Sequence, residues 1–391
     1  MKIVFLYIFM MFLSNTAYAD KYIYPDVGEP FDVYLEHVDI YLEENKVWIN
    51  EDNKTLEKQA VMPYEIKPSS QCASVTGLLF IHGLSDSPYS LKSMAQALLG
   101  ECVWIRGVLL PGHGTKAEDL LDVKFSDWQL TVKSATESFS EKVDSLYLVG
   151  YSTGGGLALD YAANSKVDLA GLILLSPLLK INSSLDWLPS LLTYFTDWLD
   201  HDESDDYVKY ASIPIPAMAE AYRLAFSVRS DLTAQKVLLP VFVVVSDEDT
   251  TLDSSVTVTY FQQTLLNPNS SLQLYSSDPT KSTLKLNDNR ISVTQSYSAD
   301  LNVSSLSHLA VHVAPADSHY GQHGDYRACN WYLHQESFSE CKMDENNWYG
   351  EKGELLTSKS EHGARMTWNP FFADLIKDVR TFIHATKNES K

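Results

Sequence analysis

The chain has 391 residues, and its 51 acidic residues against 30 Lys plus Arg give a formal charge of −21. Hydrophobic residues make up 45% and charged residues 21% of the chain, which is typical of a globular protein and not of a disordered or fibrous one. Phosphate contacts need basic patches, so the acidic excess excludes nucleic acid as a partner and disfavours electrostatic attraction to anionic lipid headgroups.

The first residues have the pattern of a secretory signal peptide. Lys2 is followed by the apolar run Ile3–Leu13 and then by an A-x-A cleavage site that ends at Ala19. The apolar run is too short for a stable membrane span. We therefore expect residues 1–19 to be removed and the mature protein, without a membrane span, to be periplasmic or secreted. A retained N-terminal anchor is the alternative.

The cysteines agree with export. The chain has an even set of four, at positions 72, 102, 329 and 341. In an oxidising compartment such a set favours two disulfides over a metal site, and none of the spacings is the CxxC that zinc sites commonly use.

The pattern along the chain predicts an α/β fold. An N-terminal extension, residues 20–65, contains one predicted helix, Phe31–Glu44, whose apolar residues recur every three or four positions. Beyond it, apolar runs typical of buried strands alternate with helical patterns; these runs are Leu78–Ile81, Val103–Ile105, Leu146–Val149, Leu172–Leu175 and Val241–Val245. This alternation predicts a mostly parallel central sheet with helices on both faces.

Two stretches depart from this alternation. Residues 180–236 combine aromatic residues with prolines in helical stretches, and they predict a helical cap inserted between two strands. Residues 277–300 are rich in Ser, Asn and Asp and are interpreted as a loop. The chain ends in a predicted helix that starts near Asn369-Pro370.

The strongest chemical signal is a G-x-S-x-G motif, Gly150-Tyr151-Ser152-Thr153-Gly154. It directly follows a predicted strand and directly precedes a helical run, which is the context that a nucleophilic serine on a sharp turn requires. The glycines let the strand and the helix approach each other, and the helix directs its free N–H groups toward the serine. The motif predicts that Ser152 is a nucleophile; the alternative is a glycine-rich structural turn.

A second signal is His82-Gly83-Leu84, at the end of another predicted buried strand. The backbone N–H groups of Leu84 and Thr153 can together hold an oxyanion, and two such donors stabilise the tetrahedral intermediate of acyl transfer. We interpret His82 as a scaffold residue that braces this loop and not as a general base.

These motifs, with the run Leu109-Leu110-Pro111-Gly112-His113-Gly114, resemble the α/β-hydrolase superfamily. The resemblance is closest to its branch of monoacylglycerol lipases, carboxylesterases and serine-aminopeptidase-like enzymes. It implies a hydrolase core formed by residues 66–179 and 237–388 around the cap. In this fold the strands after Cys72 and Cys102 are neighbours, which implies the pairs Cys72–Cys102 and Cys329–Cys341. His113 is expected to brace its loop.

The resemblance also implies where the acid and the histidine of a catalytic triad lie, because they follow the serine in the order acid, then histidine. The family pattern G-x-x-D-x-x-V falls on Ser246, Asp249 and Leu252 and so selects Asp249, with Asp247 and Asp253 left open. His308, on a loop after a small residue, fits the histidine best, and His312 and His319 are the alternatives.

The C-terminal histidines also permit a metal site. His308 and His312 are spaced H-x3-H, as are His319 and His323, and aspartates lie nearby. Proline and glycine residues disfavour a helix there, so we expect no metal and no cofactor.

Together these features predict a serine esterase or lipase-like hydrolase that acts on a small-molecule ester or lipid-like substrate through an acyl-enzyme. The same machinery could instead cleave an amide, as in a serine aminopeptidase, and an inactive hydrolase-like binding protein is a third alternative. We expect the aromatic and leucine side chains of the cap to wall an apolar acyl site, and the acidic stretch Asp197–Asp206 to rim its entrance or face solvent.

Overall fold

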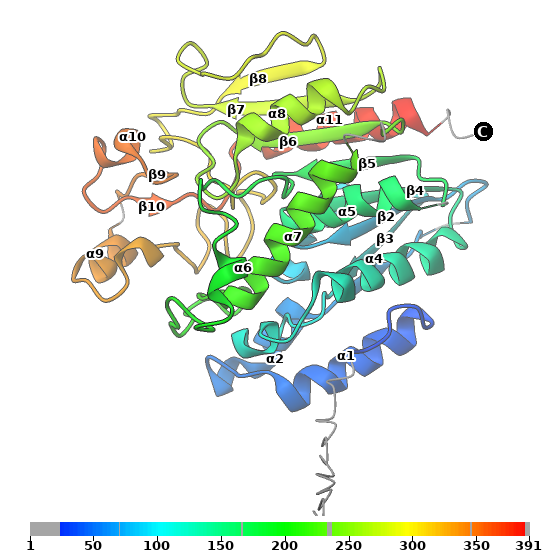
Figure 1. Ribbon diagram of the computed structural model, residues 1–391, viewed down its shortest axis with the longest axis horizontal. Coiled ribbons are helices and arrows are strands. Elements are labelled where there is room, and N and C mark those ends of the chain that lie inside the picture. The colour runs from blue at the N-terminus through cyan, green and yellow to red at the C-terminus, as the bar shows by residue number, and fades with distance from the viewer. Residues whose placement is uncertain (1–23, 70, 166, 233–236, 345, 388–391) are drawn as a thin grey trace, which may run out of the picture.

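The computed structural model describes residues 24–69, 71–165, 167–232, 237–344 and 346–387. The predicted signal peptide, residues 1–19, lies outside this part of the chain. The described residues form an eight-stranded sheet in the order β1-β3-β2-β4-β5-β6-β7-β8, in which β1 is antiparallel to β3 and the other neighbours are parallel (Figure 1). The strands are β1 (Tyr64–Ile66), β2 (Thr76–Ile81), β3 (Val103–Val108), β4 (Ser145–Tyr151), β5 (Gly171–Leu175), β6 (Val241–Ser246), β7 (Ser271–Ser276) and β8 (Ile291–Gln295).

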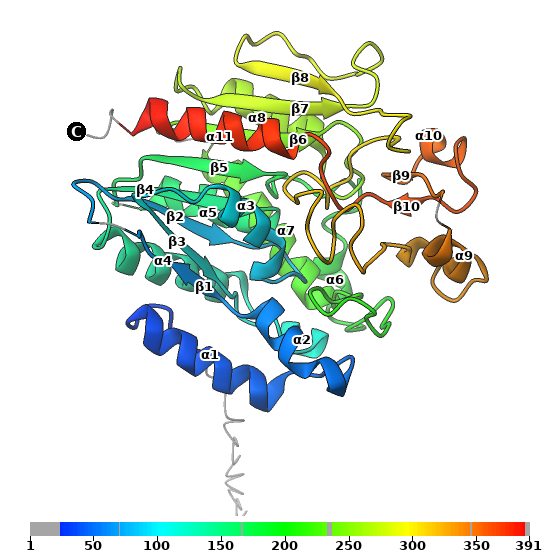
Figure 2. The ribbon, with the colours of Figure 1, turned by 180° about the vertical axis from the view of Figure 1, so that it is seen from behind.

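The sheet separates two hydrophobic cores because successive side chains of a strand point to opposite faces. In β2, Leu79 and Ile81 pack into one core, whereas Leu78 and Phe80 pack into the other. One face is covered by α4, α5, α7 and α8, and the other by α3 and α11 (Figures 1 and 2). These helices are α3 (Lys92–Ala97), α4 (Phe125–Ser140), α5 (Thr153–Asn164), α7 (Ile215–Leu232), α8 (Ser254–Gln263) and α11 (Phe372–Thr386). The predicted mostly parallel sheet with helices on both faces is confirmed.

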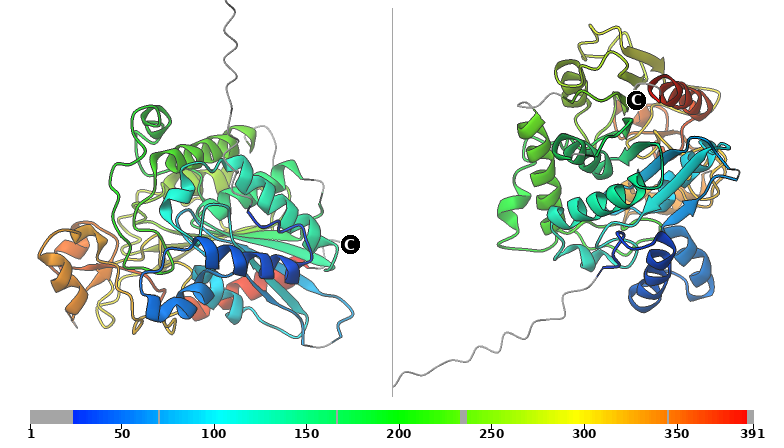
Figure 3. Two further views of the ribbon diagram at one scale, coloured as in Figure 1. Left: turned by 90° about the horizontal axis from the view of Figure 1, so that it is seen from below. Right: turned by 90° about the vertical axis from the view of Figure 1, so that its right-hand side faces the viewer.

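The N-terminal extension packs onto the same fold. The predicted helix is present as α1 (Phe31–Asn45), and its buried stripe, which includes Tyr34, Val38 and Leu42, joins the core on the α4 side. A short helix, α2 (Lys54–Val61), leads into the edge strand β1. Figure 3 shows this extension lying along one side of the sheet.

The prediction of a loop over residues 277–300 is wrong in part, because β8 (Ile291–Gln295) lies within it and pairs with β7. This strand is at the edge of the sheet, and none of its five residues is fully buried. It therefore lacks the continuous apolar run by which the central strands are recognised in the sequence.

Two excursions from the sheet surround its carboxyl edge. The cap between β5 and β6 contains α6 (Pro189–Leu192) and α7, and α7 packs against α5 through Ala217, Ala221 and Leu224. A second excursion, residues 309–371, which we call the C-terminal segment, precedes α11 and lies beyond the ends of the strands (Figures 1 and 2). It contains α9 (Ser337–Met343), α10 (Glu354–Thr357) and the two-stranded sheet of β9 (Tyr349–Gly350) and β10 (Ala364–Arg365).

Both predicted disulfides are confirmed, as Cys72–Cys102 and Cys329–Cys341. The first joins the segments that precede β2 and β3, which pair from Thr76 and Val103 onward. The second lies within the C-terminal segment. No helix in the described ranges is both long enough and apolar enough to cross a bilayer.

Replacing Cys72 and Cys102 together by alanine should lower the free energy of unfolding by about 3–4 kcal/mol, because this bond spans a sequence separation of 30 residues in the unfolded chain. Urea denaturation followed by tryptophan fluorescence measures the change. The Cys329, Cys341 double alanine variant is the comparison, and its loss should be about 1 kcal/mol smaller because the separation is 12 residues. A Cys72, Cys102 variant as stable as wild type would contradict this.

Candidate active site

The strand order of the sheet indicates where on its carboxyl edge a ligand would bind. β2 lies between β3 and β4, so the chain leaves β2 toward one side and returns to its other side as β4. Loops diverge at such a switch point and leave a crevice, where open α/β sheets bind their ligands. The loop after β2 is His82-Gly83-Leu84 and the residue after β4 is Ser152, so both sequence motifs lie at this point.

Ser152 occupies a strained turn. Its φ of 52° and ψ of −115° are values that a residue with a side chain rarely adopts. The turn is possible because Gly150 and Gly154 lack side chains: a Cβ on Gly150 would overlap the carbonyl oxygen of Gly154, and a Cβ on Gly154 would overlap that of Ile81. In this conformation Ser152 lies at the sharp turn beyond the end of β4, and it is partly exposed.

A chain of hydrogen bonds links Ser152 to a histidine and an aspartate. His308 Nε2 lies 3.1 Å from Ser152 Oγ, and His308 Nδ1 lies 2.7 Å from Asp249 Oδ2. The other carboxylate oxygen, Oδ1, accepts hydrogen bonds of 2.8 Å from the backbone N–H groups of Thr251 and Leu252. Asp249 and His308 are buried. In the tautomer that carries its proton on Nδ1, toward Asp249, the ring has Nε2 available to accept the proton of the serine hydroxyl.

The loop after β2 lies against the serine. A Cβ on Gly83 would stand 3.1 Å from Ser152 Cβ, so only glycine permits this approach without a shift of its neighbours. Thr153 is the first residue of α5, and its N–H has no carbonyl one turn earlier in the helix to bond. Gly83, which precedes Leu84, thus lies against Ser152, and Thr153 follows the serine directly in the chain.

His82 and His113 brace the loops around this point, as the sequence predicts. His82 Nε2 accepts from the Leu110 N–H at 3.0 Å, and His113 Nε2 accepts from the Ser85 N–H at 3.1 Å. Burial lowers the pKa of His82 to about 4 and that of His113 to about 3. Both rings are therefore neutral, and each can donate through Nδ1 to a nearby backbone carbonyl oxygen.

The alternative candidates from the sequence have other partners. Asp253 caps α8, and Asp247 accepts a hydrogen bond from the Ser276 hydroxyl. His312 is fully buried against Tyr151, with ring centroids 4.1 Å apart, and burial lowers its pKa well below the usual range. Among the described residues, no three His, Cys, Asp or Glu side chains are grouped to hold a metal ion.

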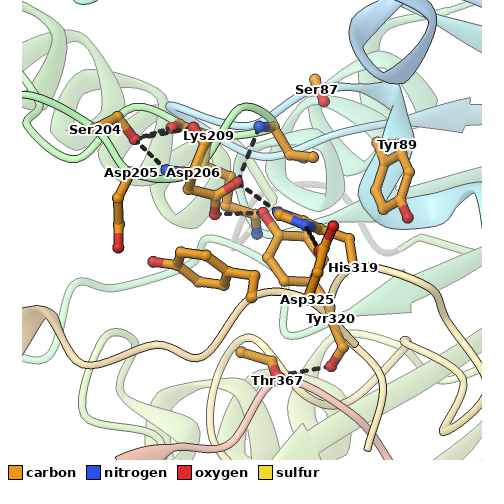
Figure 4. Close-up of polar contacts among 12 residues, drawn as sticks. Ser87, Tyr89, Ser204, Asp205, Asp206, Lys209, His319, Tyr320, Asp325 and Thr367 are labelled. Carbon is orange, nitrogen blue, oxygen red and sulfur yellow. Dashed lines mark hydrogen bonds and ion pairs between the residues drawn. The ribbon is translucent and has the colours of Figure 1, made fainter. Parts of the chain in front are cut away.

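The buried His319 ring belongs to a network that fixes the cap to the C-terminal segment (Figure 4). Its Nε2 lies 3.0 Å from Asp206 Oδ1 and its Nδ1 lies 2.5 Å from Asp325 Oδ1, while the Tyr320 hydroxyl donates to Asp206 Oδ2 at 2.6 Å. The prediction that the acidic stretch Asp197–Asp206 faces solvent or rims an entrance is wrong for Asp206, which is buried. A charged stretch gives no sign of which carboxylate will have buried partners.

The same part of the cap is fixed to the loops of the hydrolase core. Lys209 Nζ lies 3.4 Å from Asp86 Oδ2, and the Tyr210 N–H donates to the Ser85 carbonyl at 2.9 Å. The Tyr210 hydroxyl donates to the Gly112 carbonyl at 3.1 Å. Cap residues 204–211 are thus held between the loop after β2, the loop that carries His113 and the C-terminal segment.

A cavity of about 300 Å³ lies between the loop after β2, the cap and the loop that carries His308, and neither Ser152 nor His308 is part of its lining. Its lining includes Ser85, Lys209, Tyr210, Ile213, Leu309 and Arg365, and Ser85 and Leu309 are the chain neighbours of Leu84 and His308. Three aromatic residues of the cap, Trp187, Tyr194 and Phe195, are 47%, 80% and 78% exposed and do not line this cavity, whereas Tyr210 does. The lining of the cavity is partly polar.

Sequence reasoning missed the residues that the C-terminal segment contributes. Arg365, at the end of β10, lines the cavity, and Glu351 directly follows β9 and accepts from the His308 N–H at 3.3 Å. The two strands are each two residues long, so no periodicity marks them in the sequence.

Comparison with known proteins gives the class. A sequence profile of the alpha/beta hydrolase family matches residues 78–288, more than half of the chain, and the chain belongs to this family. Over 185 residues it is 26% identical to a thermostable monoacylglycerol lipase of Bacillus sp. strain H-257, covering 44% of this chain and 70% of the relative. It is 31% identical over 97 residues, 25% of this chain and 36% of the relative, to the 2-succinyl-6-hydroxy-2,4-cyclohexadiene-1-carboxylate synthase of Klebsiella pneumoniae.

Solved structures are similar over a comparable part of the chain. One is a structure from work on LipS and LipT, two metagenome-derived lipolytic enzymes. It is 20% identical and covers 55% of this chain and 87% of its own, with a TM-score of 0.49.

The His319 network predicts a dependence of stability on pH. Burial by itself lowers the pKa of His319, but its hydrogen bonds to Asp206 and Asp325 outweigh burial, and the net shift is upward. A raised folded-state pKa means that the stabilisation is complete below about pH 6.5, the unfolded value, and is lost as the pH rises through the folded value. His319→Gln should cost about 2 kcal/mol at pH 6 and much less at alkaline pH.

Thermal or urea unfolding of wild type and variant from pH 6 to 9 measures this difference. His334→Gln is the control, because His334 is 79% exposed in its pair with Asp202 and such pairs contribute little. A His319→Gln loss that stays constant across this pH range would contradict the prediction.

Proposed function

We propose that the protein is a serine hydrolase that cleaves carboxylic esters through an acyl-enzyme. The observation that carries the proposal is the chain of hydrogen bonds from Ser152 Oγ through the His308 ring to Asp249, with the serine on a strained turn at the switch point of the sheet. A nucleophile, a base in hydrogen-bond reach and a group that orients the base are the parts that acyl transfer needs.

In this mechanism Ser152 Oγ attacks the ester carbonyl carbon while His308 Nε2 takes the hydroxyl proton. The negative charge that develops on the carbonyl oxygen is held by the N–H groups of Leu84 and Thr153. His308 then returns the proton to the leaving alcohol, which departs and leaves the acyl group on Ser152. Water, activated by His308, attacks the acyl-enzyme and releases the acid. Asp249 holds the ring and stabilises its protonated form, and the chemistry requires no cofactor.

The cavity next to the loop that carries His308 supports one class of substrate. Its lining includes the polar side chains of Ser85 and Asn330, and its volume suits a hydroxylated leaving alcohol of the size of glycerol. This lining supports a monoacylglycerol-like substrate, as does the similarity to a monoacylglycerol lipase. The two disulfides support export to an oxidising compartment, periplasmic or extracellular.

Two alternatives use the same site. A serine aminopeptidase would turn over aminoacyl anilides faster than p-nitrophenyl esters, and an inactive binding protein would neither hydrolyse these substrates nor react with a fluorophosphonate. Parallel assays of the wild-type protein with both substrate series and with the fluorophosphonate separate the three.

Ser152→Ala should abolish labelling by the fluorophosphonate and lower turnover of p-nitrophenyl esters by about 10⁴-fold or more, because it removes the atom that attacks. Labelling on a gel and steady-state rates measure the effect, with circular dichroism to verify the fold. A folded variant that retains its rate would exclude a serine mechanism.

His308→Ala should reduce turnover about as much as Ser152→Ala, since residues that act as one unit give similar losses singly. His312→Ala and His319→Ala should keep most of the activity, because neither ring bonds to Ser152 or Asp249. The opposite ranking in the same ester assay would move the base to another histidine.

A further inference from the structure

The two-stranded sheet of the C-terminal segment ends in an ion pair beside the proposed triad. The Glu351 carboxylate directly follows β9, and its side chain is 1% exposed. Arg365 is the last residue of β10, and its Nη2 donates to Glu351 Oε2 at 2.8 Å. The Arg365 backbone N–H donates to the Ala328 carbonyl, and the Met366 N–H to that of Gly350, so the pair rests on a backbone fixed by hydrogen bonds.

One side of the pair contacts the loop that carries His308. Glu351 Oε2, the same oxygen that accepts from Arg365, also accepts from the His308 backbone N–H at 3.3 Å. The residue before the histidine is held too, because the Ser307 hydroxyl donates to the Met366 carbonyl at 2.5 Å. The C-terminal segment therefore fixes the backbone on which the imidazole is mounted.

The other side contacts the loop that carries Asp249. Arg365 Nη2 donates to Thr251 Oγ1 at 2.7 Å, and the Thr251 N–H donates to Asp249 Oδ1 at 2.8 Å. Arg365 Nη2 thus links two groups. One is the Glu351 carboxylate, which bonds the histidine loop, and the other is Thr251, which bonds Asp249.

We propose that Glu351 and Arg365 are positioning residues, which hold the loops of Asp249 and His308 at the separation that their hydrogen bond requires. The proposal rests on the proposed function of Ser152, His308 and Asp249. The two loops do not follow neighbouring strands, because Asp249 follows β6 whereas His308 lies beyond the edge strand β8. The Ser246 hydroxyl at the end of β6 donates to the Leu306 carbonyl at 2.7 Å and gives a second link, which the ion pair extends to Asp249 and His308 themselves. Both bonds leave from one nitrogen of a rigid planar group, so the two partners lie at fixed angles to each other, whereas the ammonium of a lysine rotates freely.

The competing role for Arg365 is direct contact with substrate, because it also lines the cavity, and its Nε is buried without a hydrogen-bond partner among the described residues. A residue that binds substrate in the ground state changes KM, whereas one that positions the base changes kcat. The split between the two constants distinguishes the roles.

The test is the kinetics of Arg365→Gln and Glu351→Gln on a p-nitrophenyl ester. We expect kcat and the rate of inactivation by fluorophosphonate to fall about 10- to 100-fold, with KM nearly unchanged, because small misplacements of a reacting group have effects of this size. Arg365→Lys should recover only part of the loss. Thr251→Val, which removes only the link to the aspartate loop, should give a smaller fall in kcat, and Thr251→Ser, which keeps the hydroxyl, should restore it.

The matched control is Arg327→Gln in the same segment. Arg327 Nη1 donates to the carbonyls of Cys341, Lys342 and Asp344 and contacts neither loop of the triad, so its loss should leave kcat unchanged. If Arg365→Gln does not fold, the Thr251 variants decide the question.

A second readout does not depend on turnover. The proton that His308 Nδ1 shares with Asp249 should give a downfield ¹H NMR resonance, assigned by its absence in His308→Ala. We expect this resonance to broaden or move upfield in Arg365→Gln and Glu351→Gln and to remain in Arg327→Gln. An unchanged resonance, wild-type kcat or a rise in KM alone would overturn the proposal. A wild-type protein that hydrolyses no ester would instead refute the proposed function, and the resonance would still decide the positioning role.

Discussion

The close approach of β2 and the start of α5 is the constraint on which the rest of the site depends. At Gly154 the helix passes so near the Ile81 carbonyl that no side chain fits, and this contact forces Ser152 into a positive φ. Backbone bonds then hold the turn: the Ser152 N–H donates to the Leu175 carbonyl, and the Ser152 carbonyl accepts from Leu178 at 2.8 Å. The strain is local, and the burial of the surrounding strands and helix on both sides of the sheet compensates for it.

The segments around this turn are held in place by two different kinds of interaction. The loops after β2 and β6 belong to the hydrolase core, and backbone N–H groups and neutral histidines set their shape. The cap and the C-terminal segment are held by charged groups. Lys209 joins the cap to Asp86 of the core, and Asp206 of the cap pairs with His319 of the C-terminal segment. Within that segment Arg365 pairs with Glu351, which accepts from the His308 N–H. Partly buried ion pairs of this kind favour one arrangement of the loops over others more than they add to overall stability.

Much of this arrangement could be predicted because its signals are local in the sequence. The turn at Ser152 is marked by a motif in which each glycine is needed where a side chain would clash. Asp249 could be selected because it follows a recognisable buried strand. His308 was one of several histidines, and nothing in its neighbourhood except a preceding serine set it apart. Glu351, Arg365 and Asp206 could not be found, since their role depends on partners more than 40 positions away and each lies in a stretch that reads as polar surface. The edge strand β8 was missed for the related reason that one side of it has no neighbour to bury it.

The order of the elements along the chain also determines at which stage of folding the active site and the second core can form. Ser152 and His308 are 156 positions apart, and the hydroxyl of Tyr147 in the central strand β4 bonds to Thr386, 239 positions later. Contacts of such high sequence separation carry a large loop-closure entropy and form late in folding. A chain that emerges from its N-terminus would therefore leave uncovered, until α11 is made, the part of this face of the sheet that α3 does not cover. The second hydrophobic core is the part of this protein most exposed to aggregation before the last fifteen-residue helix docks.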